Sequence, residues 1–320
     1  MRPSTLEPTK ISVPVLVIGF NRPDKILTLL NNLSNLGVEN LYVSLDGPRD
    51  HHDSEDCKLA LDYLHAFRNK FKLRVIWRES NLGCCLGVVS AIDWFFSLTT
   101  NGIILEDDCV PSRDTLIYFQ DKLHPKNSEK NPQIGMFSAH NPFRHWPKSI
   151  ESNYFLIGAW ATYAKVWHDV RKDFFRFTGP QLLSNKKRGR SFSESLFWWA
   201  NSNNARLGAV DTWDGIFSDQ MWRLNLKCLV PQSNLVTNTG FGPKATHTRN
   251  PTDSGFVDIK DNSRSDFDEN LKTFYYKLNC LSGIKAATRT IVRLVVRRGV
   301  VDFEKTLAED VKSRRELNAL

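Results

Sequence analysis

The sequence predicts an α/β protein with an open, mostly parallel sheet flanked by helices. From residue 13 to about 145, apolar runs of strand length alternate with longer segments that have helical periodicity. Helices of that length between strands imply parallel pairing through right-handed crossovers. No linker rich in Pro, Gly or Ser divides the chain, and 320 residues with 41% hydrophobic content can fill one large core. We therefore expect both halves to complete one domain.

The first strand is the apolar run VPVLVIGF, and the segment after it has apolar residues at helical spacing from Ile26 to Leu36. Pro23 suits the first turn of this helix, and Gly37 suits its end. The same alternation continues along the chain. Strands are expected at NLYVSLDG, KLRVIWRE, GIILEDD and QIGMFSA, and helices at DSEDCKLALDYLHAF, GVVSAIDWFFSL and RDTLIYFQDKL.

Composition narrows the class of protein without deciding its partner. Lys and Arg exceed Asp and Glu by 43 to 35, and a net charge of +8 suits phosphorylated small molecules, anionic membranes or nucleic acid. No nucleic-acid motif is present, so no nucleic-acid partner is expected. The six cysteines lack C-x-x-C spacing, which argues against a structural zinc site and a disulfide scaffold. With no apolar run of about 18 residues and no signal-type segment, a cytoplasmic location is expected.

After about residue 145 the clean alternation is lost and aromatic residues become frequent, as in SFSESLFWWANSNNARL. The segment 251–275 reads as a polar loop, and residues 276–320 as a basic helical tail. The stretch GIKAATRTIVRLVVRRGVV within this tail is both basic and apolar. It is either a helix that lies on the inner face of an anionic membrane or a docking helix with solvated arginines.

Polar side chains follow the predicted strands where each strand ends. In an open α/β sheet, ligands bind beyond the carboxyl ends of the strands, so these side chains are candidates for one site. They are Asn21 and Arg22 after the first strand, Asp46 after the second, Arg78 and Asn81 after the third, and Glu106, Asp107 and Asp108 after the next.

The acidic triplet is the most specific of these signals. In an extended strand Glu106 and Asp108 would point one way and Asp107 the other. Three carboxylates need compensating charge, and Mg²⁺ or Mn²⁺ with oxygen ligands is the usual solution. Alternatively, Asp107 and Asp108 cap the next helix or bind loop amides. A glycosidase pair is less favoured because such pairs usually come from different segments.

Five segments together carry a family resemblance: PVLVIGFNRPDK, VSLDG, RESNLG, IILEDDCVPS and NLVTNTGFGPKATHT. They resemble bacterial sugar-nucleotide glycosyltransferases of the GT-A (Rossmann-like) fold and, more distantly, the eukaryotic N-acetylglucosaminyltransferase that initiates complex N-glycans. The resemblance implies a GT-A domain over 1–275, with a nucleotide-sugar half at 13–145 and a less regular acceptor half at 146–250.

The same resemblance implies a nucleoside-diphosphate sugar donor, with UDP-sugar favoured, a Mn²⁺ or Mg²⁺ cofactor, and a glycan or lipid-linked glycan acceptor in surface polysaccharide biosynthesis. Asp108 would bind the metal, and His247 would complete the metal shell, touch the diphosphate or be an ordinary loop histidine. Glu106 and Asp107 would face the sugar and ribose hydroxyls. The remaining donor-binding residues implied are Asn21, Arg22, Asp46, Arg78 and Asn81.

An inverting transferase also needs a base for the acceptor hydroxyl. The segment DTWDGIFSDQMW offers Asp214 first, with Asp211 and Asp219 as alternatives, and each could instead cap a helix. Trp160 and Trp213 could stack on sugar rings or belong to the core. Retention instead of inversion stays open.

Two other activities compete with this interpretation. A sugar-1-phosphate nucleotidyltransferase usually has a Gly-rich, Arg-containing loop after the first strand, whereas GFNRPDK contains only Gly19. A non-catalytic domain that binds glycans or partners would not need the intact triplet.

Overall fold

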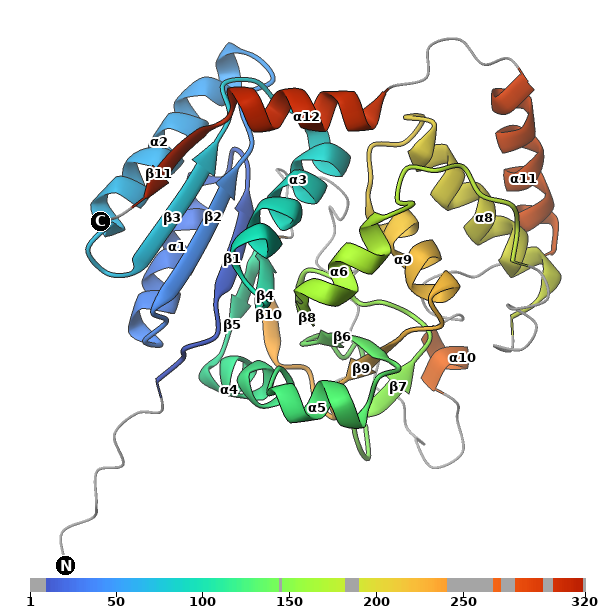
Figure 1. Cartoon of the computed structure of the whole chain (residues 1–320), viewed down its shortest axis with the longest axis horizontal. Helices are drawn as coiled ribbons and strands as arrows, with labels where there is room; N and C mark the ends of the chain where they lie inside the picture. The colour runs from blue at the N-terminus through green and yellow to red at the C-terminus, as the bar shows by residue number, and fades with distance from the viewer. Residues whose placement is uncertain are drawn as a thin grey trace, which may run out of the picture.

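The computed structural model describes residues 10–143, 146–181, 190–240, 267–271, 280–295 and 302–318. A nine-stranded sheet in the order β11-β3-β2-β1-β4-β8-β6-β9-β7 forms its centre (Figure 1), and β10 and β5 form a separate two-stranded ladder. The strands are β1 Val15–Gly19, β2 Asn40–Leu45, β3 Lys72–Trp77, β4 Asn101–Glu106, β5 Cys109–Pro111, β6 Ile134–Ser138, β7 Ile150–Ser152, β8 Ala159–Tyr163, β9 Lys227–Val230, β10 Val236–Asn238 and β11 Arg315–Asn318.

Helices cover both faces of this sheet. They are α1 Pro23–Asn35, α2 His51–Phe67, α3 Gly83–Leu98, α4 Arg113–Lys122, α5 Pro125–Lys130, α6 Ala164–Arg171, α8 Phe192–Arg206, α9 Asp214–Arg223, α10 Phe267–Leu271, α11 Cys280–Val295 and α12 Phe303–Ser313. Successive residues of β1 pack into different cores: Leu16 lies in the cluster with α3 and α9, and Val17 in the cluster with α1 and α4. This two-sided burial explains why the first strand reads as an unbroken apolar run.

The predicted α/β class is confirmed, and the parallel part of the sheet is β3-β2-β1-β4. Beyond β4 the pairing is mixed: β8 lies antiparallel between β4 and β6, whereas β6 and β9 are parallel. The loss of clean alternation after residue 145 corresponds to this change, because β7 and β8 are not separated by a crossover helix. α1 begins at Pro23, and Gly37 follows its end with a positive φ of 75°, as expected.

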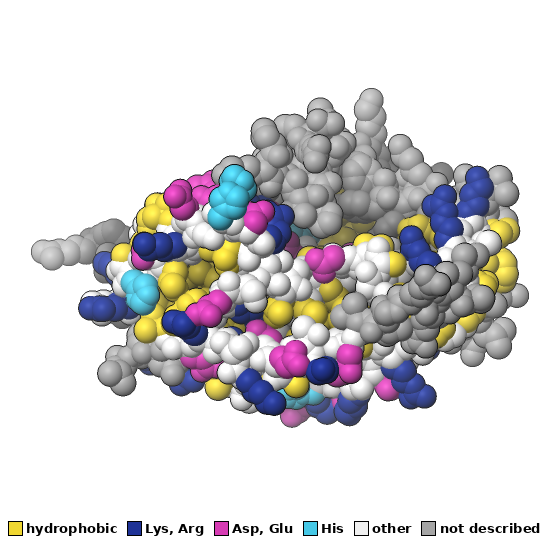
Figure 2. Space-filling view, turned by 90° about the horizontal axis from the view of Figure 1, so that it is seen from above, with side chains coloured by type: hydrophobic (Ala, Val, Ile, Leu, Met, Phe, Trp, Pro, Cys, Tyr) yellow, Lys and Arg dark blue, Asp and Glu magenta, His cyan; other side chains and the backbone are white. Residues whose placement is uncertain are grey.

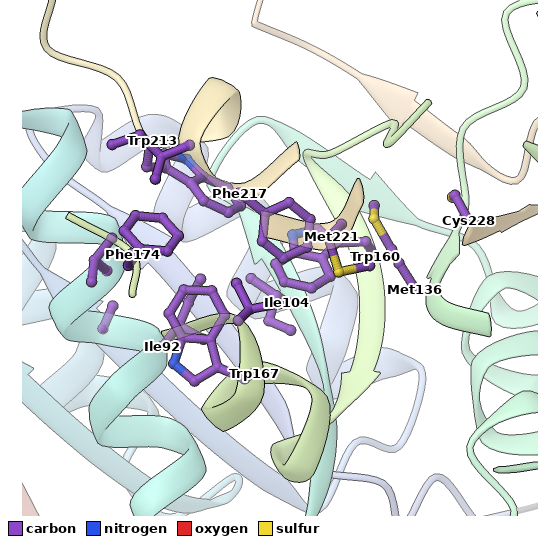
Figure 3. Packing of buried hydrophobic residues seen from close by; sticks show 14 of the residues in the cluster. Ile92, Ile104, Met136, Trp160, Trp167, Phe174, Trp213, Phe217, Met221 and Cys228 are labelled. Carbon is purple, nitrogen blue, oxygen red and sulfur yellow. The ribbon is translucent and has the colours of Figure 1, made fainter. Parts of the chain in front are cut away.

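The aromatic half of the sequence forms the core that supports α9 (Figure 3). Trp160 on β8 stacks on Trp213 with ring centroids 5.9 Å apart, and Phe217 on α9 contacts both rings. All three side chains are buried. This packing fixes the start of α9 near the end of β4, where the acidic triplet begins.

The C-terminal part of the chain divides into two structural roles. The sequence placed α12 and β11 in a helical tail. β11 instead pairs antiparallel with β3 at the edge of the sheet, and α12 contacts α3 (Figure 1). α11 packs instead against α8 at the opposite end of the molecule. Across the described ranges, no helix combines the length and apolar character that crossing a membrane requires.

Candidate functional site

The ends of β1, β2 and β4 meet at one edge of the sheet. The backbone N–H of Asp46 donates to the Gly19 carbonyl at 3.0 Å, and that of Asp107 donates to the Ile18 carbonyl at 3.1 Å. The polar residues that follow these strands therefore lie together, as the parallel order of the strands requires.

Arg22 binds two members of the acidic triplet. Its Nε donates to Asp107 Oδ2 at 3.2 Å and its Nη1 to Asp108 Oδ2 at 3.0 Å, and Nη2 also contacts Asp107 Oδ1. The expected alternation of faces is wrong beyond Glu106, because β4 ends there and residues 107–108 form a turn. Asp107 is only 2% exposed and anchors Arg22, so its placement does not fit a contact with ligand hydroxyls. Arg22 thus supplies part of the positive charge that the triplet needs.

Glu106 has no comparable partner. Among the residues that the structure describes, none donates a hydrogen bond to its carboxylate. Burial, followed by the charges of Asp108 and Asp107, raises the pKa of Glu106 to about 8. Burial also raises the pKa of Asp107 to about 7, although Arg22 opposes this shift. One guanidinium therefore does not balance three carboxyl groups, and the cluster can accept further positive charge.

Asp108 is held by the segment that follows β10. Its carbonyl accepts hydrogen bonds from Thr239 N at 2.8 Å and Thr239 Oγ1 at 3.1 Å. A Cβ added to Gly240 would lie 2.1 Å from Asp108 Oδ2, so only glycine leaves that carboxylate in place. The TNTG segment at residues 237–240 thus contributes a close backbone approach to the third acid.

The Asp46 carboxylate binds backbone N–H groups at the start of α3. Its carboxylate accepts hydrogen bonds from Leu82 N at 3.0 Å, Gly83 N at 3.2 Å and Asn81 Nδ2 at 2.9 Å. Burial raises its pKa, and these donors oppose the shift in part. Asn81 and Asp46 lie together, as expected. Asn81 binds Asp46, and Asp46 also binds the backbone at the start of α3.

The three aspartates considered as the base have different surroundings. Asp211 accepts hydrogen bonds from Cys84 N and Cys85 N, both at 2.8 Å, so it caps α3. Asp219 is buried between Arg206 at 2.9 Å and Arg223 at 3.0 Å. Burial acts to raise the pKa of Asp219, but the two guanidinium groups outweigh it and hold the pKa below its usual value.

Asp214 is the accessible member of the three. It is the first residue of α9, it is exposed, and its carboxylate accepts a hydrogen bond from the Thr212 hydroxyl. Its charge also contributes to the raised pKa of Glu106. An exposed carboxylate can accept a proton from a bound hydroxyl group.

Three predicted site residues take structural positions instead. Arg78 is 6% exposed and makes four hydrogen bonds, to Asp310, Ser44 and Ser90, so it does not reach toward the triplet. Trp160 and Trp213 are 1% and 3% exposed. Protein covers their ring faces, so the stacking role predicted for them does not fit this placement.

Arg49, Asp53, Cys109 and His140 lie close to predicted site residues, although no sequence signal identified them. Asn21 donates to Asp53 at 2.5 Å, and Arg49 donates to the same carboxylate at 2.7 Å. His140 follows β6, and its Nε2 lies 3.9 Å from the Cys109 sulfur, which in turn lies 3.5 Å from Asp108 Oδ1. Burial lowers the pKa of His140 to about 4, so it is neutral. His247 lies outside the described residues, and its metal role stays a prediction.

The described residues fit a metal ion that draws only part of its shell from the protein. No three His, Cys, Asp or Glu side chains in this part of the chain converge as a complete metal site. A Mg²⁺ site built on one or two carboxylates plus substrate phosphates does not need three. Glu106 and Asp108 Oδ1 are the carboxylate oxygens that Arg22 leaves available, and Asp108 Oδ1 also lies 3.5 Å from the Cys109 sulfur. A cavity of about 540 Å³ lies elsewhere, between the segment that follows α6, the end of α8 and the start of α12, and none of the predicted site residues lines it.

No protein-family model matches this sequence, and no curated protein matches it. HddC from Yersinia pseudotuberculosis is 13% identical, with 50% of this chain and 81% of that chain covered and a TM-score of 0.32. A Drosophila β1,4-galactosyltransferase 7 mutant in complex with manganese, UDP-Gal and xylobiose is 12% identical, with 80% and 84% covered and a TM-score of 0.32. UDP-glucose pyrophosphorylase complexed with UDP-glucose is 7% identical, with 69% and 91% covered and a TM-score of 0.36.

Solved structures similar to this chain therefore include a galactosyltransferase and a pyrophosphorylase that were solved with nucleotide sugars, all at low identity. Similarity at this level does not decide between their reactions.

Proposed function

We propose that this protein is a metal-dependent, inverting glycosyltransferase that moves a sugar from a nucleoside-diphosphate donor to a hydroxyl of a glycan acceptor. The observation that carries the proposal is the pairing of two features at one sheet edge. Glu106, Asp107 and Asp108 form an acidic cluster that Arg22 alone does not balance, and the charge of the exposed Asp214 at the start of α9 acts on Glu106. A UDP-sugar donor and a role in surface polysaccharide synthesis are part of the same proposal.

On the donor side, Asp108 with Glu106 beside it would hold Mn²⁺ or Mg²⁺ against the diphosphate. The ion, when bound, stabilises the negative charge that collects on the departing diphosphate. Arg22 lies within reach of the same phosphates because it already contacts Asp108. Asp46 and Asn81 fix the start of α3 beside them, which favours this corner for the nucleoside.

On the acceptor side, Asp214 takes the hydroxyl proton as the acceptor oxygen bonds to the anomeric carbon. The bond from that carbon to the diphosphate oxygen breaks at the same time, and the nucleoside diphosphate leaves with the electron pair. Asp214 can hold one position during this step because Trp213 and Phe217 fix the first turn of α9 in the aromatic core.

A sugar-1-phosphate nucleotidyltransferase is the competing activity. The chain passes from Gly19 at the end of β1 to Pro23 at the start of α1 through only three residues, Phe20, Asn21 and Arg22. That connection contains no Gly-rich loop to surround a triphosphate, which favours the transferase.

The decisive experiment offers both reactions to the full chain with Mn²⁺. Transferase chemistry releases a nucleoside diphosphate from one member of a sugar-nucleotide panel, whereas the competing chemistry releases pyrophosphate from a nucleoside triphosphate and a sugar 1-phosphate. We expect Asp108→Asn to lose Mn²⁺-dependent donor binding. We expect Asp214→Asn to keep donor binding and lose about 10²- to 10⁴-fold in transfer rate.

Asp62→Asn, at an exposed position on α2, is the matched control and should behave as the parent. The proposal is wrong if pyrophosphate is the product. It is also wrong if Asp108→Asn binds donor and Mn²⁺ as tightly as the parent does.

A further inference from the structure

α11 carries a row of cations on its exposed side. From residue 280 to 301 the sequence contains no Asp or Glu, and it contains the five cations Lys285, Arg289, Arg293, Arg297 and Arg298. Within the described helix, Lys285, Arg289 and Arg293 follow one another at intervals of four residues and are all exposed. In Figure 2, dark blue side chains gather at the right of the molecule, on the side where α11 lies in Figure 1.

No carboxylate of the described residues forms an ion pair with this row. Arg293 donates to Asn204 Oδ1 on α8 at 2.7 Å, which is a neutral partner. α8 contains one acid, Glu194, and that side chain is buried and accepts a hydrogen bond from the Tyr154 hydroxyl. Like charges four residues apart destabilise a helix, so this row is unfavourable unless an external anion faces it.

Apolar side chains are exposed on the same helix. Ile284 and Ile291 are 44% and 52% exposed and lie seven residues apart, on nearly the same side of α11. The side that packs against α8 contains Ala287 and Thr290, which are buried. α11 therefore presents an apolar row next to a basic row, as interfacial helices do.

We infer that α11 is the surface through which this protein docks on a membrane that contains anionic lipids. Lys285 and Arg289 pair with lipid phosphates, and Ile284 and Ile291 enter the boundary between headgroups and acyl chains. An anionic polymer would satisfy the cations but leave the two isoleucines in water, whereas a lipid surface accommodates both rows. The inference rests on α11 alone and does not depend on the proposed activity.

The test is co-sedimentation of the full chain with vesicles of phosphatidylcholine alone and of phosphatidylcholine with phosphatidylglycerol, in about 0.1 M salt. We expect partition onto the anionic vesicles only, and release at high salt. Lys285→Gln with Arg289→Gln should weaken partition by about tenfold or more. Ile284→Ser with Ile291→Ser should weaken it on the same vesicles without changing retention on immobilised heparin.

The matched control is Lys58→Gln with Arg68→Gln, which removes two exposed cations from α2 and the turn after it, at the far end of the molecule (Figure 1). The control should bind vesicles as the parent does, and thermal unfolding should show that all variants are folded. Equal loss in this control would overturn the inference, because net charge and not α11 would be responsible. Unchanged vesicle binding by the isoleucine variant would also overturn it, because the apolar row would then have no part in the binding.

Discussion

Glu106 ends β4 without a hydrogen-bond partner among the described residues, and its raised pKa makes the stability of the fold depend on pH. The folded-state value is about 8, against an ordinary value of 4.5. A carboxyl group that binds its proton more tightly in the folded chain stabilises the fold at low pH and loses that contribution as the pH rises from about 4.5 to about 8. Glu106→Gln cannot ionise, so it should escape this loss.

We therefore expect the melting temperature of Glu106→Gln to equal that of the parent at pH 3.5, below the ordinary pKa of the carboxyl group. At pH 8.5, without added metal, it should exceed the parent value by at least about 3 °C. Differential scanning calorimetry across this range measures the effect, and Glu309→Gln on the exposed side of α12 is the control. Equal pH profiles for Glu106→Gln and the parent would show that Glu106 is not destabilised by its neighbours.

Arg22 should be the counter-ion of Asp107 and Asp108 when no metal is bound. Removing it leaves Asp107 buried without a partner, and we expect Arg22→Gln to lower the free energy of unfolding by about 3 kcal/mol. Mn²⁺ should then stabilise this variant more than it stabilises the parent, because it no longer competes with a guanidinium. Thermal shift against Mn²⁺ concentration measures both effects. A smaller Mn²⁺ response in the variant would mean that Arg22 helps to bind the ion.

At the sheet edge where β1, β2 and β4 end, the location of a site residue could be predicted wherever that residue directly follows a strand. Arg22, Asp46 and Glu106 come together because parallel strands end at the same edge, and that rule needs only the order of the strands. The chemical role of each one could not be predicted in the same way. Asp211 caps a helix whose first turn lies 127 residues earlier in the chain, and local sequence contains no signal for such a contact.

At the scale of elements, α3 connects the two halves of the site. Its first turn is held by Asp46 from the end of β2 and by Asp211 from the segment before α9. Both carboxylates bind the free N–H groups of a helix N-terminus, where negative charge is favoured. The loop between α8 and α9 thus helps to set the position of a helix that lies more than 100 residues earlier in the chain.

Asp211→Ala should destabilise the protein by about 1–2 kcal/mol, because two backbone N–H groups of α3 lose their acceptor. Asp211→Asn keeps one acceptor oxygen and should lose less. Hydrogen exchange should quicken at the amides of Cys84 and Cys85 and stay unchanged in α1. Transfer activity that falls with no change in stability or exchange would instead identify Asp211 as the base in place of Asp214.

The order of the elements was less predictable than their type. Short apolar runs identified β1 to β4 and the helices between them, since periodicity reports the burial of each segment. Periodicity does not report which strand a segment joins, so the insertion of β8 between β4 and β6 could not be foreseen. For the same reason β11, four residues with one apolar side chain, gave no strand signal and yet completes the sheet.

At the scale of the whole molecule, the C-terminal segment completes one edge of the nine-stranded sheet. β11 covers the open edge of β3, and α12 carries Asp310 into a pair with Arg78 that leaves both side chains almost fully buried. The two residues lie 232 positions apart, and the Arg78 nitrogen atoms also bind Ser44 on β2 and Ser90 on α3. This network joins the sheet, α3 and the end of the chain in one unit.

Asp310→Ala should lower the free energy of unfolding by about 3–5 kcal/mol, because it leaves the buried Arg78 guanidinium without a counter-charge. Glu309→Ala changes the neighbouring residue of α12, whose side chain is exposed, and should cost no more than about 0.5 kcal/mol. Chemical denaturation of both variants measures the difference. Replacing both partners, Arg78→Leu with Asp310→Leu, should recover much of the loss, because no buried charge remains. A double variant as unstable as Asp310→Ala would show that shape at this junction, more than charge, holds the C-terminal segment to the sheet.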